Sequence, residues 1–407
     1  MDATTPEPRR ATLPLAGRTV LDLSKVIAGP LCGQWLGDLG AEVIKVEPVE
    51  GGDETRGWPP FRGGESASCM SLNRNKRSIA LDLKAEEGRA IVRRLAAGAD
   101  VAIQGFGSGT AERLGVDRAS LVAARPDLIY CEISGFGRDG PLGDRPGYDV
   151  MVQAFSGLVS TMGEPGGGVV RASFSPVDQA TAQHALSGIL AALIERERNG
   201  RGVLVEVSLL DSAMGLMGYM AANYWTSGAL PRRMGSAHPL LCPYQALDTA
   251  DGVIMLAVGN DAQWRRFCAA AGIGPERDDP RFATNAARVA HFQGTIDLVQ
   301  AVLSRRTTAA WCEALTAASV PCSPVNTLDA ALAHPQVAGR GLLREDWHST
   351  LGRVPSVGYP VRLDGGFQPG GLPPPLHGGH TSEILGGLGY SGAEIAGLFA
   401  RGVVAGS

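Results

Sequence analysis

The chain has 407 residues and a formal net charge of −4, and 44% of its residues are hydrophobic against 19% charged. This length and composition predict a globular protein of two or three domains and exclude a collagen-like fibre, a coiled coil and an intrinsically disordered chain. The near balance of 37 Lys and Arg against 41 Asp and Glu leaves no basic excess for binding nucleic acid.

The N-terminal segment, residues 1–12, is polar and proline-rich, and we expect it to be disordered. It lacks the apolar run of a signal peptide. No apolar segment of the chain approaches the roughly 18 residues that a membrane span needs. The seven cysteines are scattered and form no CxxC pair, which is typical of a reduced compartment. We therefore expect a cytoplasmic protein without a membrane partner.

The first half of the chain alternates short apolar segments with helical patterns. Residues 19–23 predict a strand, residues 29–39 a helix that Gly40 ends, and residues 42–47 a second strand. Strands that alternate with helices at this spacing predict a mostly parallel sheet. The further strands expected are 78–82, 100–103, 128–133 and 203–208, and the further helices are 86–96, 178–198 and 210–225.

A nicotinamide cofactor is not expected, although two features resemble a dinucleotide-binding fold. Glu47 follows Gly29 at about the distance of a ribose-binding carboxylate, but the turn at residues 26–30 lacks the glycine fingerprint. Residues 135–140 match G-x-G-x-x-G literally. Prolines rather than a helix follow this match, so the context that would validate it is missing.

A change in residue pattern after residues 226–228 indicates a second domain. Residues 231–243 are rich in turn formers, and residues 252–257 predict a strand of a new unit that reaches to about Pro324. We expect a smaller α/β domain with its linkers over residues 226–331. The larger α/β domain is expected over residues 13–225 and 332–407.

The sequence motifs that usually indicate a metal site, a hydrolase or a kinase are absent. The histidines form no HxxxH pair, and His377 and His380 lie in a glycine-rich loop without a carboxylate at helical spacing. The chain also has neither a G-x-S-x-G elbow nor a P-loop lysine motif. We therefore expect no metal site.

Asp178 is a candidate catalytic residue because it stands at the start of the longest helical pattern. The helix dipole and the free amides of the first turn stabilise a carboxylate there as the anion. Such a residue can simply cap the helix. It can also act as a covalent nucleophile if its electrophile is held in line and water is kept out. The residue alone leaves both interpretations open.

A basic segment and a polar turn are further candidates. Residues 73–78 read NRNKRS and precede a strand, and Arg56 and Arg113 lie in loops. Such a set is either a solvated charge cluster or an anchor for phosphates. Residues 259–264 read GNDAQW, which indicates a loop end or a flap over a ligand.

Short segments in a fixed order over nearly the whole chain resemble the class III (CaiB/BaiF-type) CoA-transferases, the family of carnitine-, bile-acid- and formyl-CoA transferases. Each segment is weak alone, and their common order carries the resemblance. The segments are 15–22 (LAGRTVLD), 28–30 (AGP), 39–47 (LGAEVIKVE), 52–56 (GDETR), 73–79 (NRNKRSI), 112–115 (ERLG), 134–137 (SGFG), 147–149 (GYD), 200–202 (GRG), 238–239 (HP), 243–244 (PY), 259–264 (GNDAQW) and 379–381 (GHT).

The resemblance implies a fold, a nucleophile and a ligand. The family's catalytic aspartate precedes the long helix after the Gly-Tyr-Asp segment, and Asp178 matches it. Family members bind CoA on a Rossmann-like large domain and form a homodimer of two interlocked rings. CoA and acyl-CoA are substrates, and no tightly bound cofactor is implied. The implied CoA contacts are Val26, Ala28, Asn75, Lys76, Arg77 and Arg113, and possible substrate or flap residues are Ile27, Tyr148, Gly259, Asn260 and Asp261.

The implied reaction is transfer of CoA from an acyl-CoA to a free carboxylic acid. Ile27 stands where formyl-CoA-specific members have glutamine, and residues 259–261 replace their tetraglycine flap, so the pattern does not favour oxalate or formate. It favours succinyl-CoA or another dicarboxylyl-CoA as the donor. A dicarboxylate needs a cation for its far carboxylate, and the candidates are Arg56, Arg74 and Arg171.

Two alternatives stay open at this point. The first is an α-methylacyl-CoA racemase of the same superfamily, which uses a histidine where this chain has Tyr148. A tyrosine with an ordinary pKa near 10 is a poor base for an α-proton. The second is a non-catalytic CoA-binding scaffold that keeps the fold alone.

Overall fold

The computed structural model describes residues 13–363 and 371–406, so the expectation for residues 1–12 lies outside the described residues. The chain divides into two compact units. The expected domain bounds stay a prediction. They assign residues 157–171 to the larger domain, whereas these residues cluster with the second unit. The first unit comprises Met1–Ser156, Ala172–Gly218 and Ala338–Ser407, and the second comprises Gly157–Arg171 and Tyr219–Val337.

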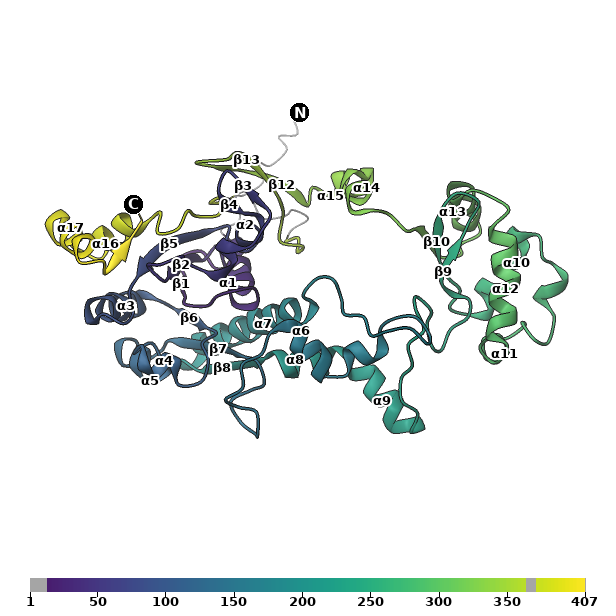
Figure 1. Cartoon of the computed structure of the whole chain (residues 1–407), viewed down its shortest axis with the longest axis horizontal. Helices are drawn as coiled ribbons and strands as arrows, with labels where there is room; N and C mark the ends of the chain where they lie inside the picture. The colour runs from purple at the N-terminus through teal and green to yellow at the C-terminus, as the bar shows by residue number, and fades with distance from the viewer. Residues whose placement is uncertain (1–12, 364–370, 407) are drawn as a thin grey trace, which may run out of the picture. The chain divides into compact units, whose positions relative to one another are not determined.

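The first unit is built on a seven-stranded, mostly parallel sheet (Figure 1). Its order is β14-β5-β2-β1-β6-β7-β8, and only the short β14 is antiparallel to its neighbour β5. Counted along the chain, the six parallel strands follow the spatial order 3-2-1-4-5-6. The strands are β1 (Thr19–Asp22), β2 (Glu42–Glu47), β5 (Lys76–Leu81), β6 (Val101–Gln104), β7 (Ile129–Ser134), β8 (Leu204–Ser208) and β14 (Val404–Ala405).

Helices cover both faces of this sheet, which explains why its strands are apolar runs rather than alternating patterns. Successive residues of β1 belong to different cores: Val20 packs into one and Leu21 into the other. The first core lies against α1 (Ala28–Asp38), α7 (Pro176–Asn199) and α8 (Leu209–Leu216). The second lies against α3 (Glu86–Gly98), α5 (Arg118–Ala124), α16 (Thr381–Gly387) and α17 (Gly392–Ala400).

The strands and helices that were predicted for the sheet domain lie at or close to their predicted residues, with one exception, whereas α5, α16 and β14 were not predicted. The helix expected over residues 210–225 is interrupted at Met217, so α8 is followed by a separate helix α9 (Gly218–Ser227). Gly215 and Gly218 flank the break, and glycine weakens a helix by about 1 kcal/mol relative to alanine. The prediction of one continuous helix was therefore wrong.

The second unit has its own small sheet and core. Strands β9 (Tyr244–Asp248), β10 (Val253–Ala257) and β11 (Cys322–Pro324) are antiparallel in the order β11-β10-β9. Trp264 and Trp311 are fully buried in the core of this unit. Its helices are α10 (Asp261–Ala271), α11 (Asn285–Ala290), α12 (Phe292–Leu303), α13 (Thr308–Ala317) and α14 (Leu328–Ala333), with α15 (Pro335–Arg340) leading back.

The remaining elements complete the first unit. They are β3 (Phe61–Arg62), β4 (Glu65–Ser66), α2 (Ala67–Leu72), α4 (Thr110–Arg113), α6 (Asp149–Phe155), β12 (Leu343–His348) and β13 (Gly352–Val357). Within the two described ranges, none of the helices combines the length and apolarity that crossing a bilayer requires.

Candidate active site

A cavity of about 370 Å³ opens at the carboxyl ends of β1, β6 and β7, in the first unit. Ligands of open α/β sheets bind at this edge, where the loops that follow the strands converge. The cavity wall comes from the segments after these three strands, from the loop before α6 and from Asp178 at the start of α7. Its lining includes Ser24 to Gly29, Gly105 to Ser108, Ile133 to Gly135 and Asp144 to Tyr148.

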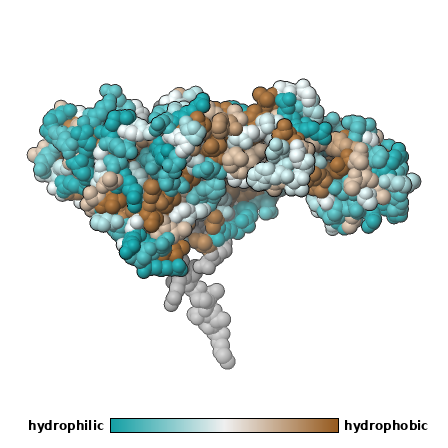
Figure 2. Space-filling model, turned by 90° about the horizontal axis from the view of Figure 1, so that it is seen from below, coloured by the Kyte–Doolittle hydropathy of each residue, from teal (hydrophilic) through white to brown (hydrophobic). Residues whose placement is uncertain are grey.

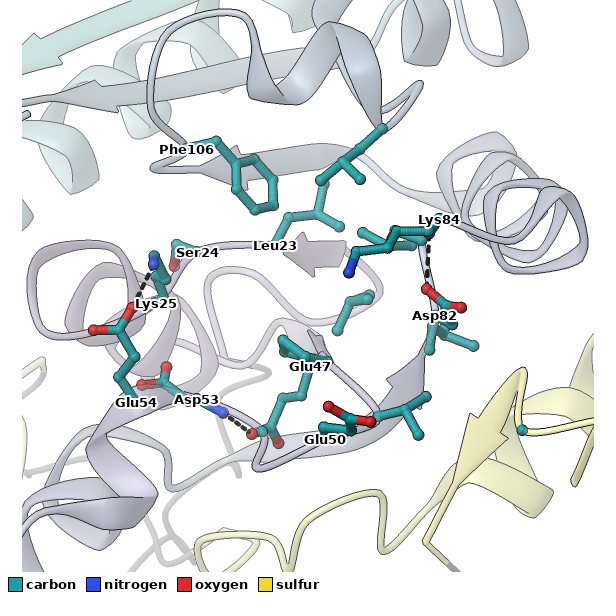
Figure 3. Close-up of a pocket in the computed structure, with 18 residues that line it drawn as sticks. Leu23, Ser24, Lys25, Glu47, Glu50, Asp53, Glu54, Asp82, Lys84 and Phe106 are labelled. Carbon is teal, nitrogen blue, oxygen red and sulfur yellow. Dashed lines mark hydrogen bonds and ion pairs between the residues drawn. The ribbon is translucent and has the colours of Figure 1, made fainter.

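A second cavity of about 460 Å³ adjoins the first along the same sheet edge, at the ends of β1, β2 and β5 (Figure 3). The two cavities share Ser24, Lys25 and Phe106 in their walls. Figure 3 shows the Phe106 ring on one side of the second cavity and Lys25 paired with Glu54. The acidic residues of the lining outnumber the two lysines: they are Glu47, Glu50, Asp53, Glu54 and Asp82 against Lys25 and Lys84.

Asp178 is the third residue of α7 and does not cap the helix. Its side chain is 8% exposed and lines the first cavity. The first-turn amides of α7 donate instead to Asp149: Oδ2 of Asp149 accepts from the N–H groups of Val177 at 2.8 Å and Asp178 at 3.0 Å. The capping interpretation of Asp178 was therefore wrong, because a residue from another helix accepts from these amides.

Burial changes the acidity of Asp178. Burial, followed by the nearby negative charge of Asp149, raises the pKa of Asp178 to about 7. The sequence predicted that the helix start would favour the anion. The structure differs because the first-turn donors are already bound to Asp149, so desolvation dominates. The carboxyl group therefore changes its protonation state near neutral pH.

The turn between β1 and α1 places backbone amides at the same cavity. Val26 has a left-handed backbone with φ of +70°, which is strained for a β-branched residue. Its N–H donates to Oδ1 of Asp53 at 3.3 Å. Ala28 begins α1, so the first N–H groups of this helix have no acceptor inside it. Ile27 and Ala28 both line the cavity. A contact of Ile27 with substrate and of Ala28 with CoA requires this position, and both contacts stay predictions.

Glycine at position 29 lets α1 approach β1 closely. A Cβ at Gly29 would lie 2.3 Å from Cβ of Ser24, so another residue would displace the turn. One helical turn further on, a Cβ at Gly33 would lie 3.0 Å from Oδ2 of Asp22 and 3.4 Å from Nζ of Lys76. The glycine face of α1 thus leaves room for a buried ion pair beneath it.

That ion pair accounts for Lys76, one of the predicted CoA contacts. Its ammonium group is fully buried and donates to Oδ2 of Asp22 at 2.8 Å, to Pro30 O at 2.7 Å and to Oδ1 of Asn73 at 2.8 Å. Burial lowers the pKa of Lys76, while Asp22 opposes this effect. Lys76 therefore supports the turn and α1 from below, and direct contact with CoA stays a prediction.

Lys45 and Asp53 form a second buried ion pair. Nζ of Lys45 lies 2.9 Å from Oδ2 of Asp53 and donates to Ser24 O at 3.0 Å. Asp53 also accepts from Val26, so Lys45 and Asp53 together tie down the strained turn. Burial raises the pKa of Asp53, but the Lys45 charge and the bonds from Thr55 outweigh it and lower this pKa to about 2.

The other predicted CoA contacts lie outside both cavity walls in the described part of the chain. Asn75 donates to Oδ1 of Asp38 at 2.7 Å and has a left-handed φ of +62°. Arg77 pairs with Glu42 and Glu383. Arg113 donates to Oγ1 of Thr110 at 2.7 Å. Their contact with CoA stays a prediction.

The predicted flap residues belong to the second unit and have local roles. Asn260 caps α10, accepting from the N–H of Gln263 at 2.9 Å. Asp261 accepts from the N–H of Asn285 at 2.7 Å and pairs with Arg288 at 3.0 Å. Gly259 donates to Oε1 of Gln263 at 2.7 Å. A flap function of residues 259–261 stays a prediction, whereas Tyr148 lines the first cavity and is 52% exposed.

Cations at the first cavity differ from those that the sequence suggested. Arg56 is bound to Glu47 through two contacts of 2.7 Å, and Arg74 is bound to Asp38. Arg171 is exposed in the second unit. The cations in the wall of the cavity with Asp178 are Lys25, Arg138 and Arg145.

Arg138 and Arg145 were missed because a loop of glycines and prolines gives no periodic signal. Arg138 pairs with Glu132 at 2.6 Å and donates to Phe106 O at 2.8 Å. The guanidinium of Arg145 lies over the ring of Phe136, 5.9 Å from its centre. The nearness of Arg145 to the Gly-Tyr-Asp segment in sequence was the one available hint.

As for metal ions, the described residues bring no three His, Cys, Asp or Glu side chains together that could hold one.

Comparison with known proteins identifies relatives over nearly the whole chain. The model of CoA-transferase family III matches residues 15–381. The succinate–glutarate CoA-transferase of Agrobacterium fabrum is 42% identical over 380 residues, which cover 91% of this chain and 95% of that protein. The human succinyl-CoA:glutarate CoA-transferase is 37% identical over 96% of this chain and 90% of its own length. A crystal structure of a CaiB/BaiF family protein from Brucella suis is 38% identical, with a TM-score of 0.84, over 93% of this chain and 100% of that one.

Proposed function

This chain belongs to CoA-transferase family III, and from this premise we propose that it moves CoA from a dicarboxylyl-CoA, of which succinyl-CoA is the foremost, to a free dicarboxylic acid, with Asp178 as the nucleophile. The family predicted from the ordered motifs is confirmed, and the chain is an enzyme of the class III CoA-transferases. The observation that carries the proposal is the placement of Asp178, a buried carboxylate whose side chain lines the cavity beside the free amides of α1.

The transfer proceeds in four displacements. The Asp178 carboxylate attacks the thioester carbonyl, the C–S bond breaks, and CoA leaves as the thiolate from an aspartyl-acyl anhydride. The thiolate then attacks the aspartyl carbonyl, which releases the first carboxylate and leaves an aspartyl-CoA thioester. The acceptor carboxylate attacks this thioester and forms a second anhydride with loss of the thiolate. Attack of the thiolate on the acceptor's acyl carbon gives the new acyl-CoA and frees Asp178.

The surroundings of Asp178 suit these steps. With a pKa of about 7, a large fraction of the group is ionised at neutral pH and is more basic than an ordinary carboxylate. Each displacement passes through an oxyanion, and backbone N–H groups at the start of α1 can stabilise it from Ile27 to Gly29. The buried pair of Lys45 and Asp53, which holds the strained turn at Val26, keeps these amides in place before the substrate arrives.

CoA is proposed to lie along the sheet edge, across both cavities. Its thioester end enters the cavity of Asp178, past Val26 and Ala28, and its adenosine end enters the acidic second cavity. The neutral adenine ring fits an acidic wall, whereas the diphosphate and the 3′-phosphate on the ribose of CoA need the lysines at its margin, Lys25 and Lys84. The strand order 3-2-1-4-5-6 supports a Rossmann-like fold for this domain.

The far carboxylate of the substrate is proposed to bind a cation of the first cavity. Arg56 and Arg74 are already bound to buried carboxylates, so they are poor candidates. Arg145 stacks on Phe136 and lines the cavity of Asp178, which makes it the best placed. The names of the relatives from Agrobacterium fabrum and human, which act on succinyl and glutaryl groups, support a dicarboxylate substrate.

The chain is further proposed to form the interlocked homodimer of its family. Helix α9 has no buried residue although it carries large apolar side chains, among them Tyr219 at 59% and Trp225 at 78% exposed. Leu230, just beyond it, is 75% exposed. Apolar residues also gather in patches on the face that Figure 2 presents. Such surfaces usually mark an interface, and light scattering of the purified protein tests for a dimer.

A mass-spectrometric transfer assay tests the proposed function. The protein is mixed with succinyl-CoA and a pool of mono- and dicarboxylic acids, with the Asp178→Ala variant alongside. We expect new dicarboxylyl-CoA masses from the wild type and a loss of at least about a thousandfold in the variant, with CoA binding kept. New acyl-CoA in equal amounts from the variant would refute the role of Asp178.

The two alternative functions give different results in the same experiment. A racemase would wash deuterium from the solvent into the α-carbon of a branched acyl-CoA without transferring CoA. A binding scaffold would bind CoA and yield neither product. Transfer from a monocarboxylyl donor alone would remove only the dicarboxylate part of the proposal.

A further inference from the structure

Asp149 holds the first turn of α7 from a neighbouring helix. It begins α6 and is 6% exposed. Pro176, the first residue of α7, has no N–H group to donate, and the next two amides, of Val177 and Asp178, both donate to Oδ2 of Asp149. The amide after them, of Gln179, bonds to Ser175 O at 3.1 Å. The donors of the turn that carries Asp178 are thus fully used.

Gln153 in turn fixes the orientation of Asp149. It lies one turn further along α6 and is fully buried. Its Nε2 donates to Oδ1 of Asp149, the oxygen that does not face α7. Its Oε1 accepts from the N–H of Ala172 at 3.1 Å, in the segment that leads into α7. The amide of Gln153 therefore has one possible orientation, and so has the carboxylate of Asp149.

This network has two consequences for Asp178. Its backbone is held to α6, so its side chain keeps one direction from the helix start into the cavity. Its carboxylate also cannot fold back onto the amides of its own helix, because Asp149 occupies them. A nucleophile must lie within a fraction of an ångström of its productive position, and a displacement of about 1 Å costs up to about 100-fold in rate.

We propose that Asp149 and Gln153 form a positioning pair for Asp178, in which Asp149 anchors the nucleophile's helix turn and Gln153 orients Asp149. The inference rests on the proposed function of Asp178 as the nucleophile. Asp149 touches the nucleophile's backbone and is not in the cavity wall, so it acts through Asp178 and not on the substrate.

Two variants separate hydrogen bonding from charge. In Asp149→Asn, the amide oxygen can still accept from α7, but its NH2 group then faces Nε2 of Gln153, donor against donor. A flip of Gln153 would turn its NH2 group toward the N–H of Ala172 instead. The double variant Asp149→Asn with Gln153→Glu restores both bonds, because one oxygen of the introduced carboxylate accepts from the new amide and the other from Ala172.

We expect kcat of Asp149→Asn to fall by about 10- to 100-fold with little change in KM for succinyl-CoA, and the double variant to recover most of this loss. The acidic limb of the kcat/KM profile of Asp149→Asn moves to lower pH, because the neighbouring negative charge is gone. In the double variant this limb lies between the two. The other titratable groups in the cavity wall are unchanged in both variants: Lys25, Arg138, Asp144, Arg145 and Tyr148.

Asp117→Asn is the matched control for replacing a helix-capping carboxylate by an amide. Asp117 caps α5 by accepting from the N–H of Ser120 at 3.1 Å, and it lines neither of the two cavities described above. This variant makes the same change from carboxylate to amide at the start of another helix, and we expect it to keep kcat. If Asp149→Asn fails to fold, Gln153→Met, which keeps the Asp149 charge, takes its place with an expected loss of about threefold to tenfold in kcat.

The results distinguish this inference from the proposed function. Full kcat in Asp149→Asn, with Asp178→Asn inactive, overturns the positioning pair alone. The same holds if the double variant folds and recovers nothing, or if Gln153→Met keeps full kcat. Activity of Asp178→Asn equal to that of the wild type overturns the proposed function and the inference with it.

Discussion

Replacing Asp178 by asparagine removes an ionisable group from a buried position, and it should therefore stabilise the folded chain above neutral pH. In the folded protein the pKa of Asp178 is raised from 3.8 to about 7. Between these values the unfolded chain releases its proton while the folded chain keeps it. The folded wild type then binds more protons, so its free energy of unfolding falls as the pH rises through this window.

The magnitude follows from the size of the pKa change. At about 1.4 kcal/mol for each pKa unit, full ionisation of the buried group costs about 4 kcal/mol. We expect Asp178→Asn to exceed the wild type by about 2–4 kcal/mol above about pH 8, and by clearly less at about pH 5. The gain in stability accompanies loss of transfer, as is common at catalytic positions.

Urea unfolding of both proteins at about pH 5 and about pH 8.5, at equal protein concentration, measures this difference. Asp100→Asn is a control of opposite sign. Burial raises the pKa of Asp100, but the Thr19 amide and Arg196 outweigh burial and lower it, so this variant should lose stability at both pH values. A difference between Asp178→Asn and wild type that does not grow with pH would contradict a raised pKa of Asp178 in the folded chain, as would a less stable variant at the higher pH.

Lys76→Met leaves Asp22 buried without its counter-ion and should cost about 3–5 kcal/mol in urea unfolding; an unchanged stability would show that the pair does not support the fold. Arg145→Gln should raise KM for a dicarboxylic acceptor about tenfold or more while leaving that for a monocarboxylic acceptor unchanged. Equal effects on both acceptors in the transfer assay would show that Arg145 does not bind the far carboxylate.

Much of the sheet could be predicted because its strands are short apolar runs between turn residues, with helical patterns between them. β2, at Glu42–Glu47, lies at the predicted residues, and α7 begins two residues before its predicted start. Asp178 could be singled out because it stands at the start of this long helical pattern, together with the order of the motifs. Local pattern was sufficient for these features.

The partners of the polar residues could not be predicted, because they come from distant parts of the chain. Asp149 binds an amide 29 positions away, and nothing in the Gly-Tyr-Asp segment indicates that partner. The basic run that contains Lys76 reads as a solvated cluster or a phosphate anchor. Its ammonium group is instead buried, because the glycine face of α1 leaves space for it beside Asp22. Such pairing depends on how close two elements approach, which residue spacing does not encode.

The proposed mechanism requires the carboxylate of Asp178 to carry the CoA between donor and acceptor. The most direct test is to incubate the protein with succinyl-CoA, quench it in acid, and map the modified peptide by mass spectrometry. We predict CoA in thioester linkage on the tryptic peptide of residues 172–196, at Asp178, and none in Asp178→Asn. Steady turnover with the covalent group on another residue, or with no covalent group at all, would contradict this mechanism.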